Sequence, residues 1–286
     1  MTLLEMMGRT FTLRGMGGCL CAAMFCLAAV LIGAAAAAEP AAGNSEYNFL
    51  GVRKAPLNKP ITTDRPSFGD APVTVPSGHF LLESGYRYGR DGDDSVHNGP
   101  VLLLRSGLAR NLELRLGWDG YVYGSNNREG FGNTRVGLKV QALREQGPVP
   151  SLVVIPELVL PTGDANVVTD EVEPMVRIAW GHSLTPSTAI SGNFNVAARA
   201  DADSSKHRLA YAASLATGFA LSTRVSGYVE YFGIFRESGL GRDTHSIDSG
   251  LAYLVSNRLQ LDAFVGAGLN DAAQDMFAGA GISHLW

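Results

Sequence analysis

The most regular feature of this chain is an alternation of apolar residues with residues of other kinds, clearest in 246–269. In residues 259–269, leucine, alanine and valine occupy every odd position, whereas glutamine, aspartate, phenylalanine and glycine occupy the even ones. Successive side chains of a strand point to opposite faces, so this period of two predicts a strand with one apolar face. The other face is mixed, where a soluble core would be uniformly apolar. An apolar outside around a polar inside is typical of a transmembrane β-barrel.

The alternation recurs from Gly78 to the C-terminus and predicts about twelve strands. Each run has about the ~9–11 residues that a tilted membrane strand needs. The predicted strands are 78–88, 100–108, 112–123, 133–143, 151–161, 173–183, 188–200, 207–218, 223–235, 244–255, 259–269 and 276–286. We therefore expect an all-β fold, an antiparallel up-and-down barrel at residues 78–286 that follows a cleaved signal peptide.

The polar connections between these runs alternate between longer and shorter. The longer ones, which include 90–98, 124–132, 162–172 and 236–243, should be external, because outer-membrane barrels have short periplasmic turns and longer external loops. Both ends of the barrel then lie on the short-turn side, which requires an even number of strands.

The first 38 residues have the pattern of a secretory signal. Arg9 and Arg14 precede an apolar run at 19–33, and alanines at 34–38 precede Glu39. A transmembrane anchor is the alternative, but the run is short of the ~20 residues that a membrane helix needs. All three cysteines lie at 19, 21 and 26, so we expect no disulfide in the rest of the chain. Residues 39–60 have no period and are predicted to be a flexible periplasmic lead-in.

Residues 61–77 form a proline-rich segment that fits neither a strand nor a solvated tail. Pro66, Pro72 and Pro76 cannot donate to a β ladder, yet the segment carries Phe68 and other apolar side chains. It stands directly before the first strand, at the periplasmic mouth. We expect it to fold into the lumen as a plug, with Asp64, Arg65 and Phe68 as its contact residues. The alternative is a position along the periplasmic rim.

Charge is balanced and falls mainly on the inner face. The chain has 23 Lys+Arg against 27 Asp+Glu and a net charge of -4, which argues against a nucleic-acid surface. The inward charges predicted to line the pore are Arg105, Glu113, Arg115, Asp119, Arg135, Lys139, Glu157, Arg177, Glu230, Asp248 and Asp262; Glu83 shares their alternation. Both signs occur on adjacent strands, so many should pair, either as a stiffening salt-bridge network or as a polar lining.

A plug in the lumen would need partners for its own charges, because an unpaired buried charge is costly. We expect Asp64 to meet Arg115 or Arg135. Arg65 should meet an acid such as Glu113 or Asp119.

Candidate catalytic and metal-binding residues are sparse. The six histidines are isolated from one another and from cysteine, so no metal site and no cofactor are predicted. Acids in the loops could bind Ca²⁺, although solvated loop charge is the simpler interpretation. A serine–histidine pair across neighbouring strands, as a lipid-cleaving barrel would need, stays open as an alternative.

Several short stretches resemble one known family. They are ITTDRPSF at 61–68, VPSGHFLLESGYRY at 75–88, LVLPTGD at 158–164 and LQLDAFVGAGLND at 259–271. Together they are similar to the MetA-pathway of phenol degradation family. The resemblance implies a transporter-like outer-membrane β-barrel of Gram-negative bacteria that passes aromatic or other small hydrophobic compounds.

The last strand ends at Trp286, which resembles the C-terminal signal that outer-membrane assembly machinery recognises. His284 departs from the usual aromatic or aliphatic residue two places earlier. We expect the partners to be the lipid bilayer, that machinery and a small-molecule solute. The predicted function is passive uptake of small, including aromatic or hydrophobic, solutes across the outer membrane. A lipid-modifying barrel enzyme and a closed structural barrel are the alternatives.

Overall fold

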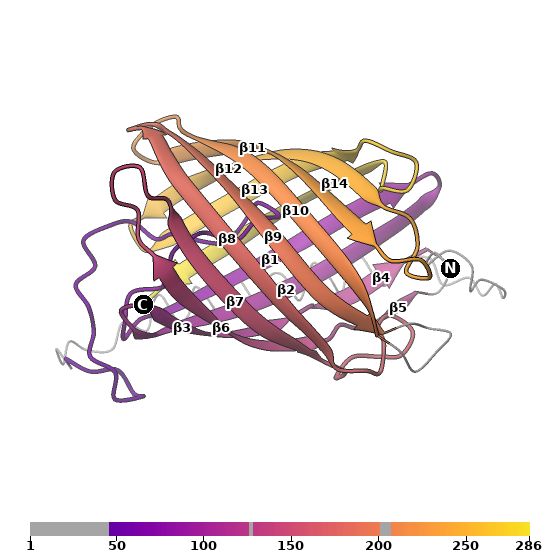
Figure 1. Ribbon diagram of the computed structural model, residues 1–286, viewed down its shortest axis with the longest axis horizontal. Coiled ribbons are helices and arrows are strands. Elements are labelled where there is room, and N and C mark those ends of the chain that lie inside the picture. The colour runs from indigo at the N-terminus through magenta and orange to yellow at the C-terminus, as the bar shows by residue number, and fades with distance from the viewer. Residues whose placement is uncertain (1–45, 126–127, 201–206) are drawn as a thin grey trace.

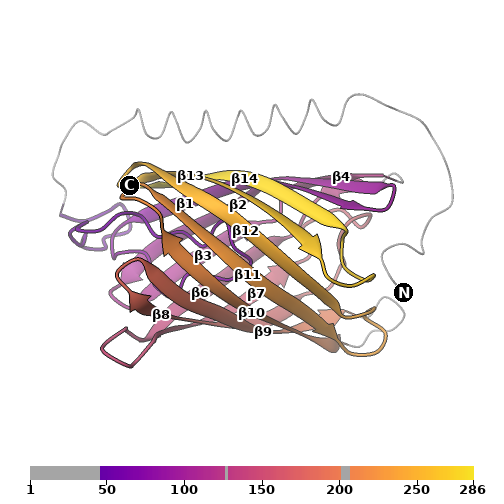
Figure 2. The same cartoon turned by 90° about the horizontal axis from the view of Figure 1, so that it is seen from above.

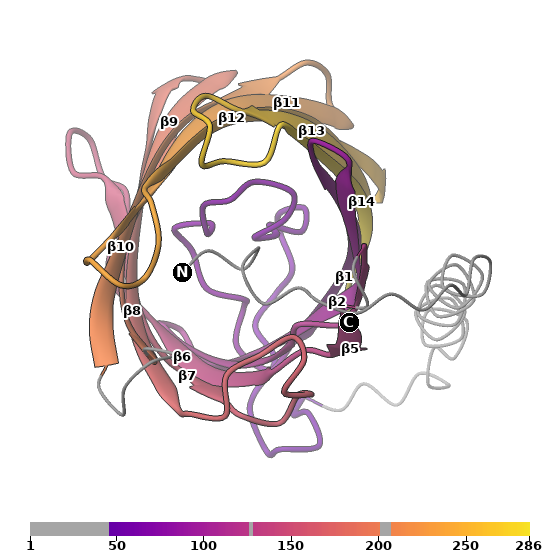
Figure 3. The ribbon, with the colours of Figure 1, turned by 90° about the vertical axis from the view of Figure 1, so that its right-hand side faces the viewer.

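The computed structural model describes residues 46–125, 128–200 and 207–286. The predicted signal peptide lies outside the described residues. The described chain folds into one closed antiparallel barrel, seen along its axis in Figure 3. Its strands are β1 (Phe80–Asp91), β2 (Asp94–Ala109), β3 (Leu112–Trp118), β4 (Tyr121–Gly124), β5 (Glu129–Phe131), β6 (Thr134–Leu143), β7 (Ser151–Leu160), β8 (Glu173–Thr185), β9 (Thr188–Ala200), β10 (His207–Ala220), β11 (Val225–Arg236), β12 (Thr244–Ser256), β13 (Leu259–Gly268) and β14 (Met276–Leu285).

These fourteen segments make twelve spans of the wall. β3 and β4 pair one after the other along β2, and their partners β6 and β5 follow each other in the same way. Each of these two pairs is thus one interrupted span. β1 pairs with both β2 and β14, which closes the barrel. The prediction of an up-and-down barrel of about twelve strands is confirmed.

The predicted long connection at 90–98 is wrong. β1 runs to Asp91 and β2 begins at Asp94, so only Gly92 and Asp93 join them. Gly92 has a φ of 56°, the left-handed conformation that tight hairpin turns require. The polar residues beyond the apolar belt pair as a continuing hairpin, so polarity alone did not mark the end of the strands. β5 likewise lies inside the predicted connection at 124–132.

The wall is apolar on its outer face and polar on its inner face, the reverse of a soluble protein. Leu116 and Leu138 are 43% and 39% exposed on the outside, whereas Glu113 and Lys139 inside are 0% exposed. Such a continuous exposed apolar surface is stable where hydrocarbon replaces water. Among the described residues there is no helix long and apolar enough to cross a membrane.

Residues 61–77 lie inside the barrel in this structure. Figures 1 and 2 show the violet segment entering through the end at which β1 begins, where the short turns also lie. The Ile61 amide donates to the Asn257 carbonyl in the β12–β13 turn, at 2.9 Å. At the other end, the Gly78 amide donates to the Gly107 carbonyl of β2, at 2.8 Å. Ile61 and Val75 pack with Leu81 and Leu285 where the segment enters.

We predict that an arginine on the outer face destabilises the barrel far more than one on the inner face. Leu116→Arg and Leu138→Arg should each cost ~2–4 kcal/mol near the membrane midplane. Ser191→Arg, which faces open space in the lumen, is the control and should cost much less. Urea unfolding in lipid vesicles measures the difference. Equal losses at all three positions would reverse the assignment of inside and outside.

The topology predicts which ends of the hairpins face the medium. Cysteine at Asp93, in the β1–β2 turn, should react with a membrane-impermeant reagent on intact cells. Cysteine at Val149, in the β6–β7 connection at the opposite end, should react only after the outer membrane is broken. The reverse labelling pattern would place the barrel the other way round in the membrane.

Candidate functional site: a lumen segment between two cavities

The lumen segment, residues 61–77, is fixed at one point by a carboxylate among three cations. Asp64 accepts from Arg115 Nη1 at 2.7 Å and from Lys139 Nζ at 2.9 Å, and Arg105 Nη1 is 3.2 Å away. These three wall side chains are almost completely buried. The expected pair of Asp64 with Arg115 is therefore present. Arg135 instead pairs with Asp119.

The charge state of this anchor follows from its surroundings. Burial alone would raise the pKa of Asp64, but the cations Arg105, Lys139 and Arg115 outweigh burial and hold that pKa well below its usual value. A depressed pKa means that the carboxylate stabilises the folded state above the unfolded value of ~4 and loses that effect only on stronger acidification. Mild acid should not release the anchor.

Wall carboxylates also bind the backbone of the lumen segment. Glu83 accepts from the amides of Asp64 and Arg65 at 3.0 and 2.9 Å, and Glu230 accepts from the amides of Phe68 and Gly69 at 2.7 and 3.1 Å. Buried backbone donors need partners, and this segment has no strand neighbour to supply them. Glutamates of the wall take that role.

A third wall glutamate holds the returning part of the segment. Glu113 accepts from the Val75 amide at 2.8 Å and pairs with Arg105 at the same distance. One side chain thus joins the wall network to the segment's backbone.

Arg65 pairs with a residue that the sequence did not suggest. Its Nη2 lies 2.9 Å from Asp262 Oδ1 on β13, so the expected partners Glu113 and Asp119 are wrong. The guanidinium rests against Gly85 on β1 and Gly281 on β14, where any added Cβ would overlap it. These two glycines leave the room that brings Arg65 within reach of β13.

The far end of the segment contacts the opposite wall. The Phe68 ring stacks on Phe232 of β11, with centroids 4.4 Å apart and planes 1° from parallel. Asp70 pairs with Arg115 and Arg177, each at 3.1 Å, and exchanges hydrogen bonds with the Asn193 amide group of β9. The segment therefore reaches from β1–β3 across the lumen to β8, β9 and β11.

The predicted pore-lining charges separate into three groups by what they contact. Arg105, Glu113, Arg115, Lys139, Arg177, Glu230 and Asp262 bind the lumen segment directly. Arg135 and Asp119 pair with each other, and Glu157 joins Arg177 at 2.9 Å. Asp248 accepts from the Tyr228 hydroxyl at 3.0 Å. Most of these charges hold the segment and leave little of their surface to line open space.

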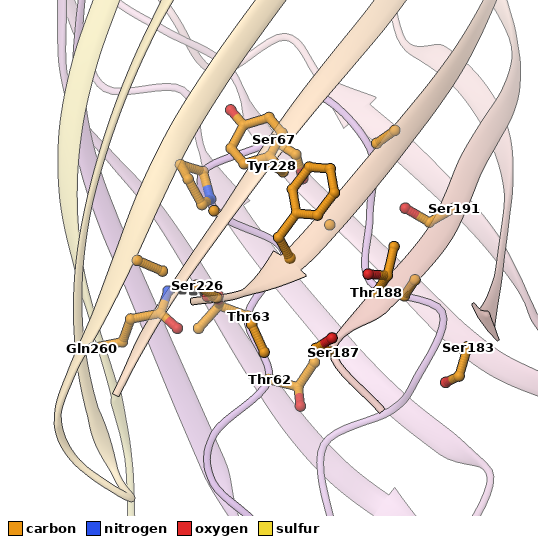
Figure 4. A pocket seen from close by; sticks show the side chains of 18 of the residues that line it. Thr62, Thr63, Ser67, Ser183, Ser187, Thr188, Ser191, Ser226, Tyr228 and Gln260 are labelled. Atoms are coloured by element: carbon orange, nitrogen blue, oxygen red, sulfur yellow. Dashed lines mark hydrogen bonds between the residues drawn. The ribbon is translucent and has the colours of Figure 1, made fainter. Parts of the chain in front are cut away.

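An open cavity of about 420 Å³ lies beside the segment, toward the end with the short turns; we call it the inner cavity. Figure 4 shows its polar side chains converging from the segment, β8, β9, β11 and β13. Most are hydroxyls; the labelled set is Thr62, Thr63, Ser67, Ser183, Ser187, Thr188, Ser191, Ser226, Tyr228 and Gln260. Gln260 donates to the Thr63 hydroxyl at 2.8 Å, which joins the segment to β13. Arg65 is the charged member of this lining.

A second cavity of about 360 Å³, the outer cavity, lies toward the other end. It is lined by charged pairs, Arg135 with Asp119 at 2.9 Å and Arg199 with Glu173, and by apolar residues of the β7–β8 connection such as Val167. The outer cavity is therefore charged, whereas the inner cavity is nearly neutral.

Sequence reasoning missed the lining of the inner cavity. Its serines, threonines, alanines and glycines occupy inward positions of β8–β12 but carry no charge, so they did not stand out from the alternation. The available signal was the absence of charge itself: inward positions 189, 191, 216 and 218 are all small and neutral.

The described residues contain no group of three or more His, Cys, Asp or Glu that could hold a metal ion. Of the histidines in this part of the chain, His182 Nδ1 lies 3.3 Å from Glu145 Oε1. His79 lies near the carbonyls of Ala55 and Trp286, and His97 and His245 contact the hydroxyls of Tyr86 and Tyr231.

Comparison with known proteins identifies the class of this barrel. The COG4313 outer membrane channel from Pseudomonas putida F1 is 15% identical, with a TM-score of 0.60 over 77% of this chain and 100% of that one. The NanC porin is 6% identical, with a TM-score of 0.52 over 72% and 98% of the two chains. The KdgM porin in complex with disordered oligogalacturonate is 12% identical, with a TM-score of 0.50 over 71% and 98%. The fold is that of outer-membrane channels and porins.

The family follows from the sequence itself. Residues 63–286 match the family described as "Putative MetA-pathway of phenol degradation", and the chain belongs to that family. The resemblance noted in the sequence is thereby confirmed. No curated protein matches the chain. The fold and the exposed apolar belt together place this barrel in the outer membrane.

We predict that Gly281→Ala displaces Arg65 from Asp262, because the new methyl group would occupy the space of the guanidinium. The loosened segment should raise single-channel conductance while leaving the barrel folded. Gly218→Ala is the matched control: it also points inward from a strand, and its Cβ would meet nothing closer than 4.0 Å. Equal conductance of the two variants in planar bilayers would contradict a role for the Arg65–Asp262 pair.

Proposed function

We propose that this chain is a passive outer-membrane channel for small uncharged solutes and that residues 61–77 act as its plug. One observation carries the proposal: the segment contacts the wall at a level between the two cavities. On β8, Arg177 binds Asp70, and it lies between Met175 of the outer cavity and Ser183 of the inner cavity. On β9, Asn193 also binds Asp70, and it lies between Arg199 of the outer cavity and Ser191 of the inner cavity.

The solute class follows from the lining of the inner cavity. Arg65 is neutralised by Asp262, so an ion that enters the cavity would give up hydration without a free charge to replace it. Hydroxyls would hydrogen-bond a neutral polar group, and alanine, glycine and Phe219 would contact an apolar one. The lining favours small neutral molecules that have both kinds of surface.

Aromatic solutes fit this class for a second reason. Tyr228 lines the inner cavity, and the Phe68–Phe232 stack lies further along the inner face of β11, beyond Glu230. A planar ring could exchange with Phe68 on the face of Phe232, since offset stacking of rings is worth about 0.5–1.5 kcal/mol. The description of the family refers to phenol degradation, and phenol is a small neutral aromatic molecule with one hydroxyl.

Two alternatives predict different behaviour. A lipid-modifying enzyme needs a base beside its nucleophile. Among the described residues, most histidine hydrogen bonds go to carbonyls and tyrosine hydroxyls. Ser183 donates to Glu145 at 3.1 Å and His182 Nδ1 lies 3.3 Å from the same carboxylate, so this group is where the enzyme alternative would have to act. A closed structural barrel would pass nothing even without its plug.

Deleting Thr62–Val75 should raise single-channel conductance several-fold, because the part of the chain that crosses the lumen is gone. Water can then solvate the wall charges, so the barrel should keep its heat-modifiable mobility in gels. A folded deletion variant with unchanged conductance would remove the plug from the mechanism.

Liposome swelling tests the solute class in the same preparations. Intact protein should admit small neutral solutes, phenol-like ones included, faster than anions or cations of similar size. Ala189→Leu, which narrows the inner cavity and whose cross-strand partners, Ser183 and Gly218, do not bind the segment, should slow the neutral solutes. Absence of swelling with both intact and deleted protein would favour the closed barrel, and release of fatty acid from the liposomes would favour the enzyme.

A further inference from the structure

The residues just before the lumen segment form a compact turn that exposes apolar side chains. Residues 46–54 fold back on themselves: the Lys54 amide donates to the Glu46 carbonyl at 2.8 Å, and the Asn48 amide donates to the Val52 carbonyl at 2.9 Å. The Asn48 side chain caps the turn by accepting from the amides of Leu50 and Val52, both at 2.9 Å. The described part of the expected flexible lead-in is thus folded at this point.

The turn is attached to the rim of the barrel. Asn48 Nδ2 donates to the Gly78 carbonyl at 3.2 Å, and the Ala55 amide donates to the Ser77 carbonyl at 2.9 Å. His79 Nε2 lies 2.8 Å from the Ala55 carbonyl. Its exposed side chains are therefore presented from a fixed position.

The exposed side chains of the turn lie on the outer side of the barrel wall, beside the start of β1. Phe80 pairs with Trp286 through two main-chain hydrogen bonds of 3.0 Å, and Leu82 pairs with His284 two places further along. Glu83, the next residue, points into the lumen, so the even residues of β1 face outward.

Phe49 covers this outer surface. The ring of Phe49 stacks on that of Phe80, with centroids 4.9 Å apart. The centroid of Phe80 is 6.5 Å from that of Trp286, and the Trp286 ring stacks on His284 with centroids 5.4 Å apart. The aromatic row begins at the tip of the turn and continues into the lipid-facing surface of β1 and β14.

Phe49 is nevertheless 83% exposed, and Tyr47 and Leu50 beside it are about half exposed. Exposing a phenylalanine ring to water from a fixed position is energetically unfavourable. Aromatic rings at the level of the headgroups, with basic residues nearby, are typical of a membrane interface. Lys54 supplies an exposed cation on the same turn, and Arg53, also exposed, pairs with Glu46, which leaves the turn with a net positive charge.

We propose that residues 46–54 are a membrane foot, which inserts Phe49 among the phospholipids of the periplasmic leaflet while Arg53 and Lys54 meet their phosphates. The foot continues the lipid-facing surface of the wall around its rim, which identifies lipid as the occupant. It is joined to the lumen segment by residues 55–60, so the membrane would hold the point from which that segment enters the barrel. This inference does not depend on what the channel carries.

A spin label measures the depth of the foot directly. The native cysteines at 19, 21 and 26 are first replaced by serine, and single cysteines are introduced at Phe49, at Leu116 as the lipid reference and at Asp93 as the water reference. The full-length barrel is reconstituted in vesicles of phosphatidylethanolamine and phosphatidylglycerol. Power saturation with oxygen and a nickel chelate should place the label at Phe49 ~5–10 Å below the phosphates, the depth usual for interfacial side chains.

Two further outcomes decide the proposal. A label at Phe49 as accessible to nickel as the one at Asp93, in protein with unchanged heat-modifiable mobility, would overturn it. Shielding that appears only when a periplasmic protein extract is added would assign the turn to a protein partner and would also overturn it.

The cations have their own test. Arg53→Glu combined with Lys54→Glu should move the label outward in vesicles that contain phosphatidylglycerol but not in neutral phosphatidylcholine vesicles. The same depth in both lipids would remove electrostatic attraction to anionic headgroups from the proposal.

Discussion

The binding of backbone amides by buried wall glutamates is the interaction on which the position of the lumen segment depends. A segment with three prolines cannot add to the sheet, yet its remaining amides enter a lumen with little room for water. Glu83, Glu113 and Glu230 accept from five of those amides. Hydrogen bonds to charged acceptors are stronger than neutral ones, and an unpaired buried donor is costly. These glutamates thus allow an irregular chain to be stable inside a barrel.

The same glutamates need cations, and this need explains the dense network around Asp64. Arg105 contacts Glu83, Glu113 and Asp64 at once, so two of the three glutamates that bind the segment, Glu83 and Glu113, are also neutralised. Removing one partner from such a network leaves the remaining charges buried without a counter-charge, which typically costs about 3–5 kcal/mol of stability for a buried pair. The charges of β1–β8 that contact the segment therefore hold it in place. They fasten the segment to one side of the lumen.

The other side of the lumen is different in kind. From β9 to β12 the inward positions are small and mostly uncharged, and the inner cavity lies against them. Glu230 is the acid on this side that binds the segment; it accepts from two amides and forms no ion pair with a cation of the described residues. The segment is thus tied strongly on one wall and lightly on the other. The contact of Phe68 and Gly69 with β11 thus lacks the cation that accompanies the contacts of Glu83 and Glu113.

The alternation of residues determined the fold almost completely, because a period of two and the demands of lipid act on each strand locally. Strand number and the inward face could be predicted in that way, and Arg115 was one of the two partners expected for Asp64. The hairpin at residues 90–98 could not, since polar residues beyond the membrane pair as readily as they loop. The partner of Arg65 could not be predicted either, because Asp262 is 197 residues away in the sequence. The two meet only because the barrel closes through β1 and β14, where Gly85 and Gly281 leave room for the arginine. The neutral cavity was likewise decided by tertiary structure, because a local pattern shows which side chains face inward but not which of them another part of the chain covers.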